Sequence, residues 1–227
     1  GLGDVYKRQP CYLYEYDVMR RQVETLRQAF PRYDLLYSIK ANPFPPVVRA
    51  LAGLGLGADA ASAPEVLLSR RCGMAKADIF FSAAGKSDAA LEAAWDEGEI
   101  IADSLVEVAR IGALCEAKGQ RRAIGVRMNP GFGMGGTVGG PSKFGINEED
   151  LPQLKALLDT LPVTVEGIHV HLKSQNLDAD VLGGCYRDSW ALAKRVQDAL
   201  ACGMRYVNFG SGVGVALSLI HISEPTR

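Results

Sequence analysis

The stretch Leu35-Leu36-Tyr37-Ser38-Ile39-Lys40-Ala41-Asn42-Pro43 places a lysine at the end of a short apolar segment. This apolar segment is typical of a β-strand. We expect Lys40 to lie at the inner end of the buried strand, where burial disfavours the charged ammonium form. A neutral amine is the form that attacks carbonyl groups to make a Schiff base. The alternative is a lysine at a strand end whose amine reaches water.

A second segment, Gly167-Ile168-His169-Val170-His171-Leu172-Lys173-Ser174-Gln175, carries paired histidines. Because side chains alternate along a strand, His169 and His171 share one face, and the apolar residues between them share the other. The two rings are either hydrogen-bonded core histidines or flat groups that can stack on a planar ligand. We expect no metal site, because no nearby Cys, Asp or Glu completes a familiar ligand spacing.

A third segment, Val207-Asn208-Phe209-Gly210-Ser211-Gly212-Val213-Gly214, follows a short apolar strand with glycines at alternate positions. Such a loop lets backbone amides approach a phosphate group. A plain turn at a strand end is the alternative. The spacing differs from Gly-x-Gly-x-x-Gly, which excludes a dinucleotide fingerprint.

Strand and helix patterns alternate along the chain. We expect strands at 35–39, 58–61, 79–82, 100–102, 123–128, 165–172 and 206–209, and helices at 17–30, 106–118, 151–161 and 188–202. This order predicts an α/β protein with a parallel sheet: a (β/α)8 TIM barrel that lacks its eighth strand. A doubly wound open sheet is the alternative. In a barrel, the carboxyl ends of the strands face the site, which would gather Lys40, Asp59, Ser82, Arg127, His171 and Gly210.

Taken together and in this order, the three segments resemble the fold type III decarboxylases that depend on pyridoxal 5'-phosphate (PLP). These are the diaminopimelate, ornithine and arginine decarboxylases, whose PLP-binding barrel is of the alanine racemase type. The resemblance extends through 57–65, 85–87, 127–130 and 142–146. It is strongest to diaminopimelate decarboxylases, because the paired histidines precede Ser-Gln and because Arg127 opens an Arg-x-Asn-Pro segment.

The resemblance implies roles for individual residues. Lys40 would attach PLP covalently, and His171 would stack on its ring. Arg127 matches a position near the phenolic oxygen of PLP, where a positive charge favours the phenolate. Asp59 and Glu65 match positions around the cofactor, although a helix cap and a solvated carboxylate are alternatives. The positions that match phosphate contacts are Ser174, Gly210, Ser211, Gly212 and Gly214.

The implied activity is PLP-dependent decarboxylation of an amino acid, with conversion of meso-diaminopimelate to lysine as the first choice. The alternatives are decarboxylation of another amino acid or of a carrier-bound substrate, an alanine-racemase-like enzyme, a non-catalytic PLP-binding barrel, and a barrel enzyme for a sugar phosphate. The chain departs from the family pattern at Lys173 and Pro64, where glycines are expected, and at Ser211 within a glycine run. These departures bear on the substrate more than on the cofactor.

Both ends of the chain differ from the family pattern. We interpret residues 1–9 and 217–227 as a non-native leader and tail, and residues 10–216 as part of the barrel domain. The family's C-terminal β-domain, which completes the site across a dimer interface, would then be absent. We therefore expect a homodimer in the full-length protein and an inactive fragment.

Composition indicates a soluble globular protein, because 48% hydrophobic residues suffice for a core. The net charge of −1 gives no reason to expect nucleic acid or an acidic membrane surface as a partner. No apolar run reaches the roughly 18–20 residues that a membrane span needs. The five cysteines are scattered without metal-binding spacing and indicate reduced thiols in a cytoplasmic protein.

Overall fold

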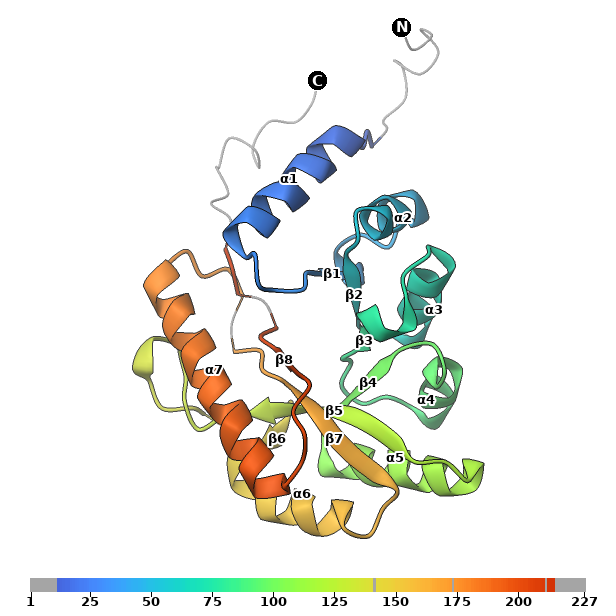
Figure 1. Ribbon diagram of the computed structural model, residues 1–227, viewed down its shortest axis with the longest axis vertical. Helices are drawn as coiled ribbons and strands as arrows, with labels where there is room; N and C mark the ends of the chain where they lie inside the picture. The colour runs from blue at the N-terminus through green and yellow to red at the C-terminus, as the bar shows by residue number, and fades with distance from the viewer. Residues whose placement is uncertain (1–11, 141, 173, 211, 215–227) are drawn as a thin grey trace, which may run out of the picture.

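A curved parallel sheet forms the centre of the computed structural model, which describes residues 12–140, 142–172, 174–210 and 212–214 (Figure 1). Its strands follow one another in chain order: β1 (Leu36–Ser38), β2 (Gly57–Ala60), β3 (Ile79–Phe81), β4 (Glu99–Ala102), β5 (Arg122–Asn129), β7 (Val163–His169) and β8 (Tyr206–Asn208). The two-residue strand β6 (Ile146–Asn147) pairs with β5 outside this path. The expectations for residues 1–9 and 217–227 concern segments outside the described residues.

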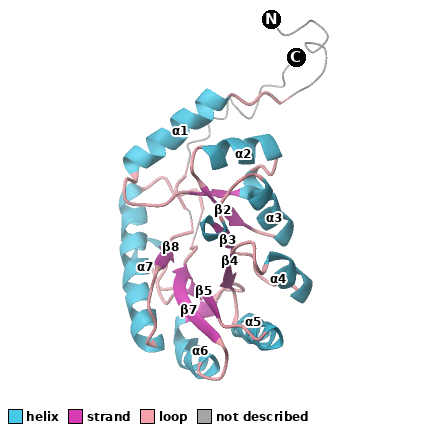
Figure 2. Ribbon diagram, turned by 45° about the vertical axis from the view of Figure 1, so that its right-hand side comes forward, coloured by secondary structure: helices cyan, strands magenta, loops and turns pink. Residues whose placement is uncertain are grey.

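The helices lie in an arc around the strands (Figure 2). They are α1 (Tyr16–Ala29), α2 (Pro45–Gly53), α3 (Ala63–Arg71), α4 (Asp88–Ala94), α5 (Leu105–Lys118), α6 (Leu151–Leu158) and α7 (Ala179–Leu200). Short 3-10 turns are η2 (Ile39–Ala41), η3 (Lys76–Asp78), η4 (Met134–Gly136) and η5 (Glu148–Asp150). Within the described ranges, no helix combines the length and the apolar composition needed to cross a membrane.

The strand order confirms the barrel prediction. Every pairing along the sheet is parallel, and the described strands along the path keep their chain order, with β6 alone lying off it. A doubly wound sheet reverses its strand order at a switch point, and this sheet has no such reversal among its described strands. Strands β1 and β8 stand at the two ends of the path, as expected for a barrel without its closing strand.

Several helices were missed by the sequence reading. Helices α2, α3 and α4 are short, so each offers few residues over which a helical period can be recognised, and α3 also has little segregation of apolar residues to one face. Helix α7 begins at Ala179 rather than at the expected 188. Its start is fixed by Asp178, whose carboxylate accepts hydrogen bonds from the backbone N–H groups of Asp180 and Val181.

The main core lies between the sheet and the helices. Helix α5 shows the pattern: Val108, Ile111 and Cys115 recur at helical spacing and are fully buried beneath β4 and β5. Its start is capped by Ser104, whose hydroxyl accepts a hydrogen bond from the Glu107 N–H at 3.2 Å. Its end is closed by Gly119 in the left-handed conformation. These caps fix α5, and with it the loop that follows β4.

The Tyr206 side chain on β8 packs against the inner face of the sheet, over Gly125 on β5 and Gly167 on β7. A Cβ atom at Gly125 or Gly167 would overlap it, so both positions must be glycine for the ring to fit. The Phe80 ring lies at 5.0 Å from the Tyr206 ring, edge to face. Tyr206 therefore ties β8 to β3, β5 and β7 below the carboxyl ends of the strands.

Candidate functional site

A cavity of about 1730 Å³ runs along the inner face of the sheet, from residues at the amino ends of the strands, such as Gly57 and Tyr206, to residues at their carboxyl ends. The positions named from the sequence that line it are Lys40, Asp59, Ser82, Arg127, His171, Ser174 and Gly210. They come from segments far apart in the chain, which the parallel sheet brings to one edge. The structure therefore brings these seven residues to one cavity.

The expectation that Lys40 is buried is wrong. Strand β1 ends at Ser38, and Lys40 follows in the turn η2, where it is exposed and lines the cavity. The buried residue of this turn is Ile39, whose side chain is fully enclosed by the core under β1 and β2. Because Ile39 enters the core, the next side chain is left on the open side, and the Lys40 amine is available to a ligand.

Asp59 on β2 is held in the cavity by two serines. Its carboxylate accepts hydrogen bonds from the hydroxyl of Ser38 at 3.3 Å and from the hydroxyl of Ser82. Glu65, in contrast, caps helix α3: its carboxylate accepts the Ala61 N–H at 2.8 Å, while the Ser62 hydroxyl accepts the Glu65 N–H. Both hydrogen bonds hold the start of helix α3, and Glu65 does not line the cavity.

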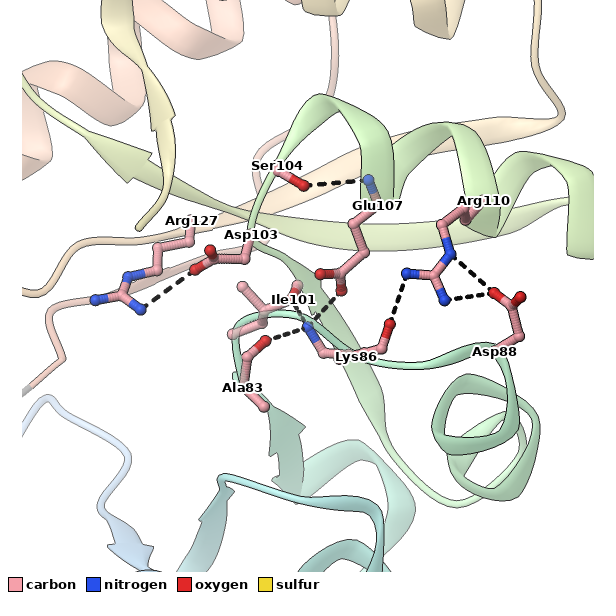
Figure 3. Close-up of polar contacts among 9 residues, drawn as sticks. All are labelled: Ala83, Lys86, Asp88, Ile101, Asp103, Ser104, Glu107, Arg110 and Arg127. Carbon is pink, nitrogen blue, oxygen red and sulfur yellow. Dashed lines mark hydrogen bonds and ion pairs between the residues drawn. The ribbon is translucent and has the colours of Figure 1, made fainter. Parts of the chain in front are cut away.

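Arg127 on β5 is fixed from two sides. Its Nη1 lies 3.2 Å from Oδ1 of Asp103, and its guanidinium carbon lies 4.8 Å from the centre of the Phe144 ring. Both side chains of the ion pair are largely shielded from water, with exposed fractions of 15% and 7%. Figure 3 shows a guanidinium nitrogen of Arg127 directed at the Asp103 carboxylate. Asp103 was missed in the sequence, although it directly follows a strand at the same edge of the sheet.

The two histidines lie in different surroundings. His169 is buried at the end of β7, and its Nδ1 has no hydrogen-bond partner among the described residues. Burial first, and then the positive charge of Arg127, lower the pKa of His169 to about 3. His171 is half-buried, and its pKa is lowered by burial and by the charges of Arg127 and Lys40. Both imidazoles are therefore neutral near pH 7.

The expected phosphate-binding residues are partly brought together. The Ser174 hydroxyl lies 3.4 Å from Nε2 of His171, and the backbone of Gly210 lies against the His171 ring. Gly212 and Gly214 do not line the cavity, and they pair instead with Asn176: its N–H donates to the Gly212 carbonyl, and its carbonyl accepts the Gly214 N–H. Ser211 and Lys173 lie outside the described residues.

The chemistry of this cavity suits a small, flat, anionic ligand. At the carboxyl ends of the strands, the cations Lys40 and Arg127 face it together with the carboxylate of Asp59. The neutral His171 ring offers a flat surface, and the Ser174 hydroxyl can donate to an anion. The unpartnered Nδ1 of His169 is a further polar atom at the cavity wall. These groups fit a phosphorylated aromatic aldehyde. The Lys40 amine can react with its carbonyl group, the charge of Arg127 can pair with an anionic oxygen, and the His171 ring can stack on its face.

The fold and site define a parallel-strand barrel of the kind that binds PLP. Residues 16–222 match the family described as "Pyridoxal-dependent decarboxylase, pyridoxal binding domain", and the chain belongs to this family. The family's domain binds pyridoxal, so PLP is the cofactor. The resemblance inferred from the three sequence segments is thereby confirmed.

Individual relatives give the same result. The L-glutamyl-[BtrI acyl-carrier protein] decarboxylase of Niallia circulans is 31% identical over 91% of this chain and 50% of its own length. The diaminopimelate decarboxylase of Helicobacter pylori strain J99 is 30% identical over 95% of this chain and 55% of its own. The crystal structure of the Helicobacter pylori diaminopimelate decarboxylase complexed with L-lysine is 25% identical, with a TM-score of 0.80 over 93% of this chain and 57% of that chain. The chain spans about half the length of the curated relatives it matches.

Proposed function

We propose that this chain is the cofactor-binding half of a PLP-dependent decarboxylase that acts on a free amino acid, with meso-diaminopimelate as the substrate and lysine as the product. The observation that carries the proposal is the meeting of Lys40, Arg127 and His171 in one cavity at the carboxyl ends of the strands. The family match favours a decarboxylase over the racemase, non-catalytic and sugar-phosphate alternatives.

Each residue has a role that its surroundings support. Lys40 is the nucleophilic amine, because it is exposed to the cavity and lies at a turn anchored by the buried Ile39. PLP, when bound, withdraws electrons from the amino acid so that the bond to its carboxyl group can break. Arg127, held by Asp103, presents a positive charge to an electron-rich oxygen of the ligand.

His171 and Asp59 position the ligand. Burial is the first cause that lowers the pKa of His171; it favours the neutral form, and the planar ring can stack on the ligand. The Asp59 carboxylate on β2 is oriented by hydrogen bonds from the hydroxyls of Ser38 and Ser82 and faces the cavity. Ser174 and the backbone from Gly210 through Ser211 to Gly212 and Gly214 are the proposed phosphate contacts. The Gly214 N–H must leave the Asn176 carbonyl before it can bind phosphate.

A second candidate is decarboxylation of an amino acid bound to a carrier protein. It is favoured by the relative from Niallia circulans, whose name describes a glutamyl group on an acyl-carrier protein. This chain is about equally identical to that protein and to a diaminopimelate decarboxylase, at 31% and 30%. Sequence identity therefore does not choose between the two substrates. One assay of the full-length protein separates the two substrates: release of carbon dioxide from free meso-diaminopimelate supports the first candidate, and release only from a carrier-bound glutamyl group supports the second.

We also propose a homodimer for the longer protein and a cytoplasmic location. Free thiols support the location, since Cys72, Cys115, Cys185 and Cys202 are unpaired in the described part of the chain. The homodimer follows from the family resemblance, in which neighbouring subunits complete the site.

Titration with PLP tests the cofactor proposal. The protein should develop a visible absorbance band in the imine region, and Lys40→Ala should abolish the band. Lys155→Ala is the matched control, because Lys155 pairs with Asp159 on an exposed helix away from the cavity. A band that survives in Lys40→Ala contradicts the role of Lys40, and the absence of any band in the unmodified protein contradicts PLP binding.

A further inference from the structure

Lys86 is a buried cation beside the cavity whose role is not explained by ligand binding. Its side chain is fully shielded from water. Its ammonium group donates to the carbonyls of Ala83 and Ile101, each at 2.6 Å, and to Oε1 of Glu107 at 2.5 Å. Three acceptors match the three N–H donors of a charged lysine, so the geometry is that of an ammonium paired with a carboxylate.

This pair joins three segments that end at the cavity edge. Ala83 follows β3, Ile101 lies on β4, and Glu107 lies in the first turn of α5 (Figure 3). Arg110 adds a further clamp, since its guanidinium donates to the Lys86 carbonyl at 2.7 Å and to the Asp88 carboxylate. The loop between β4 and α5, which carries Asp103, is thus held on both sides.

Asp103 has two cations in its surroundings. Its carboxylate pairs with Arg127 at 3.2 Å, and Figure 3 shows it between Arg127 and the Lys86–Glu107 pair. Burial lowers the pKa of Lys86, whereas the charge of Glu107 and, to a smaller extent, that of Asp103 raise it, and Arg127 lowers it. The four groups therefore act on one another as an alternating row of charges: positive, negative, positive, negative.

Glu107 supplies the negative charge that balances the buried Lys86 ammonium. A buried ammonium needs a counter-charge, and Glu107 is the carboxylate that Lys86 contacts directly. Without the Glu107 charge, Asp103 would be the remaining neighbouring carboxylate that acts on Lys86. Asp103 would then be drawn from Arg127 towards Lys86, and the guanidinium would lose its partner.

We propose that Glu107 is a positioning residue: by neutralising Lys86, it leaves the Asp103 carboxylate to hold Arg127 at the site. This role deepens the proposed function, because Arg127 is one of the residues proposed to bind PLP. It acts on Arg127 itself, so it can be tested in the absence of the cofactor.

The test is the rate at which phenylglyoxal modifies Arg127 in the PLP-free protein, measured by peptide mass spectrometry. Glu107→Gln preserves shape and removes the charge, and it should speed modification of Arg127 about fivefold, the effect of losing one modest ion pair. Lys86→Met/Glu107→Gln removes the competing cation as well and should bring the rate back to within about twofold of the unmodified protein. Lys86→Met alone should also leave Arg127 protected.

Arg122 is the internal reporter of global unfolding. It lies at the opposite end of the same strand β5, where its guanidinium donates to the carbonyls of Trp95 and Gly98. Its modification rate should not change in folded variants. If Glu107→Gln also speeds the modification of Arg122, that variant is unfolding and its Arg127 rate is not used. The test of Glu107 then rests on Lys86→Met and the double variant, in which Arg122 must stay slow and Arg127 must stay protected.

Three results overturn the proposal: an unchanged Arg127 rate in folded Glu107→Gln, a double variant as reactive as Glu107→Gln, or a faster rate in folded Lys86→Met. If the Lys86–Glu107 pair only stiffened the loop that carries Asp103, any loss of the pair would loosen this loop. Arg127 would then react faster in Lys86→Met and in the double variant. Adding PLP to the unmodified protein separates this inference from the proposed function. Failure of PLP to slow Arg127 modification counts against PLP binding and leaves the PLP-free comparison to decide the role of Glu107.

Discussion

The backbone of Gly210 lies directly against the imidazole of His171. A Cβ atom at position 210 would come 2.8 Å from Nδ1 of His171 and 2.6 Å from the carbonyl oxygen of Val170. Gly210 also has a φ of +71°, a conformation that side-chain-bearing residues rarely adopt. Its own N–H is held by the Asn208 side chain at 2.8 Å. The glycine therefore sets the place of the ring that is proposed to stack on PLP.

Gly210→Ala should displace the His171 ring and weaken PLP binding about fivefold or more, because the left-handed conformation and the contact each oppose a Cβ atom. The measurement is a PLP titration followed by absorbance. Gly203→Ala is the matched control, since a Cβ there meets no atom within 4 Å. Equal PLP affinities for the two variants would show that the Gly210–His171 contact does not position the ring.

Truncation of the two histidines should separate their roles. His171→Ala removes the proposed stacking ring and should lower PLP affinity about tenfold, as expected for one aromatic contact. His169→Ala should affect PLP less and stability more, because the His169 side chain is buried. Paired titrations and urea unfolding of both variants provide the measurement. An affinity loss that is equal or larger for His169→Ala argues against His171 as the stacking residue.

The burial of neutral His169 should make the fold sensitive to acid. Its folded-state pKa of about 3 lies below the ordinary 6.5, so below 6.5 the unfolded chain binds a proton that the folded chain refuses. This contribution to stability is present above pH 6.5 and is lost as the pH falls towards 3, at about 1.4 kcal/mol per pH unit. Urea unfolding at pH 5.5 and 4.5 should show a steeper loss than in His169→Asn. Parallel slopes would mean that His169 is protonated in the folded protein.

The contact between Gly167 and Tyr206 should matter for stability alone. Gly167→Ala forces a Cβ atom into the Tyr206 ring, and overpacking of this kind costs about 1–3 kcal/mol. Gly53→Ala is the control, because a Cβ at the end of α2 meets no atom within 4 Å. The midpoint of urea unfolding should fall for Gly167→Ala and stay level or rise for Gly53→Ala. A tolerated Gly167→Ala would show that β7 and β8 can separate freely around the ring.

The fold was largely readable from the sequence because the buried strands are continuous apolar runs that alternate with helices. The barrel follows from that order together with the right-handed crossover rule. What the pattern did not contain were short helices such as α4 and the long N-terminal part of α7, where Gly183 and Gly184 interrupt the apolar stripe. Helix boundaries of this kind depend on a cap, here Asp178, more than on periodicity.

The site was readable only where a residue sits at the end of a strand. Lys40, Asp59 and Arg127 were placed correctly at the cavity, but the burial of Lys40 was not, because alternation alone does not say that Ile39 takes the buried place in a turn. The Lys86–Glu107 pair was not foreseen, because its partners come from a loop and a helix whose contact requires the folded sheet. The partner of Arg127 could have been predicted, because Asp103 directly follows the strand that ends at Ala102.

Chemical labelling of Lys40 tests the central claim most directly. Borohydride reduction of the protein in the presence of PLP, followed by peptide mapping, should place the label on Lys40, an exposed lysine that lines the cavity together with Arg127 and His171. Lys86 is a built-in comparison, because its amine is enclosed and paired with Glu107. A label confined to Lys40 is the predicted result, and a label on Lys86 or Lys143 with Lys40 unmodified would contradict the assignment of this cavity as the PLP site.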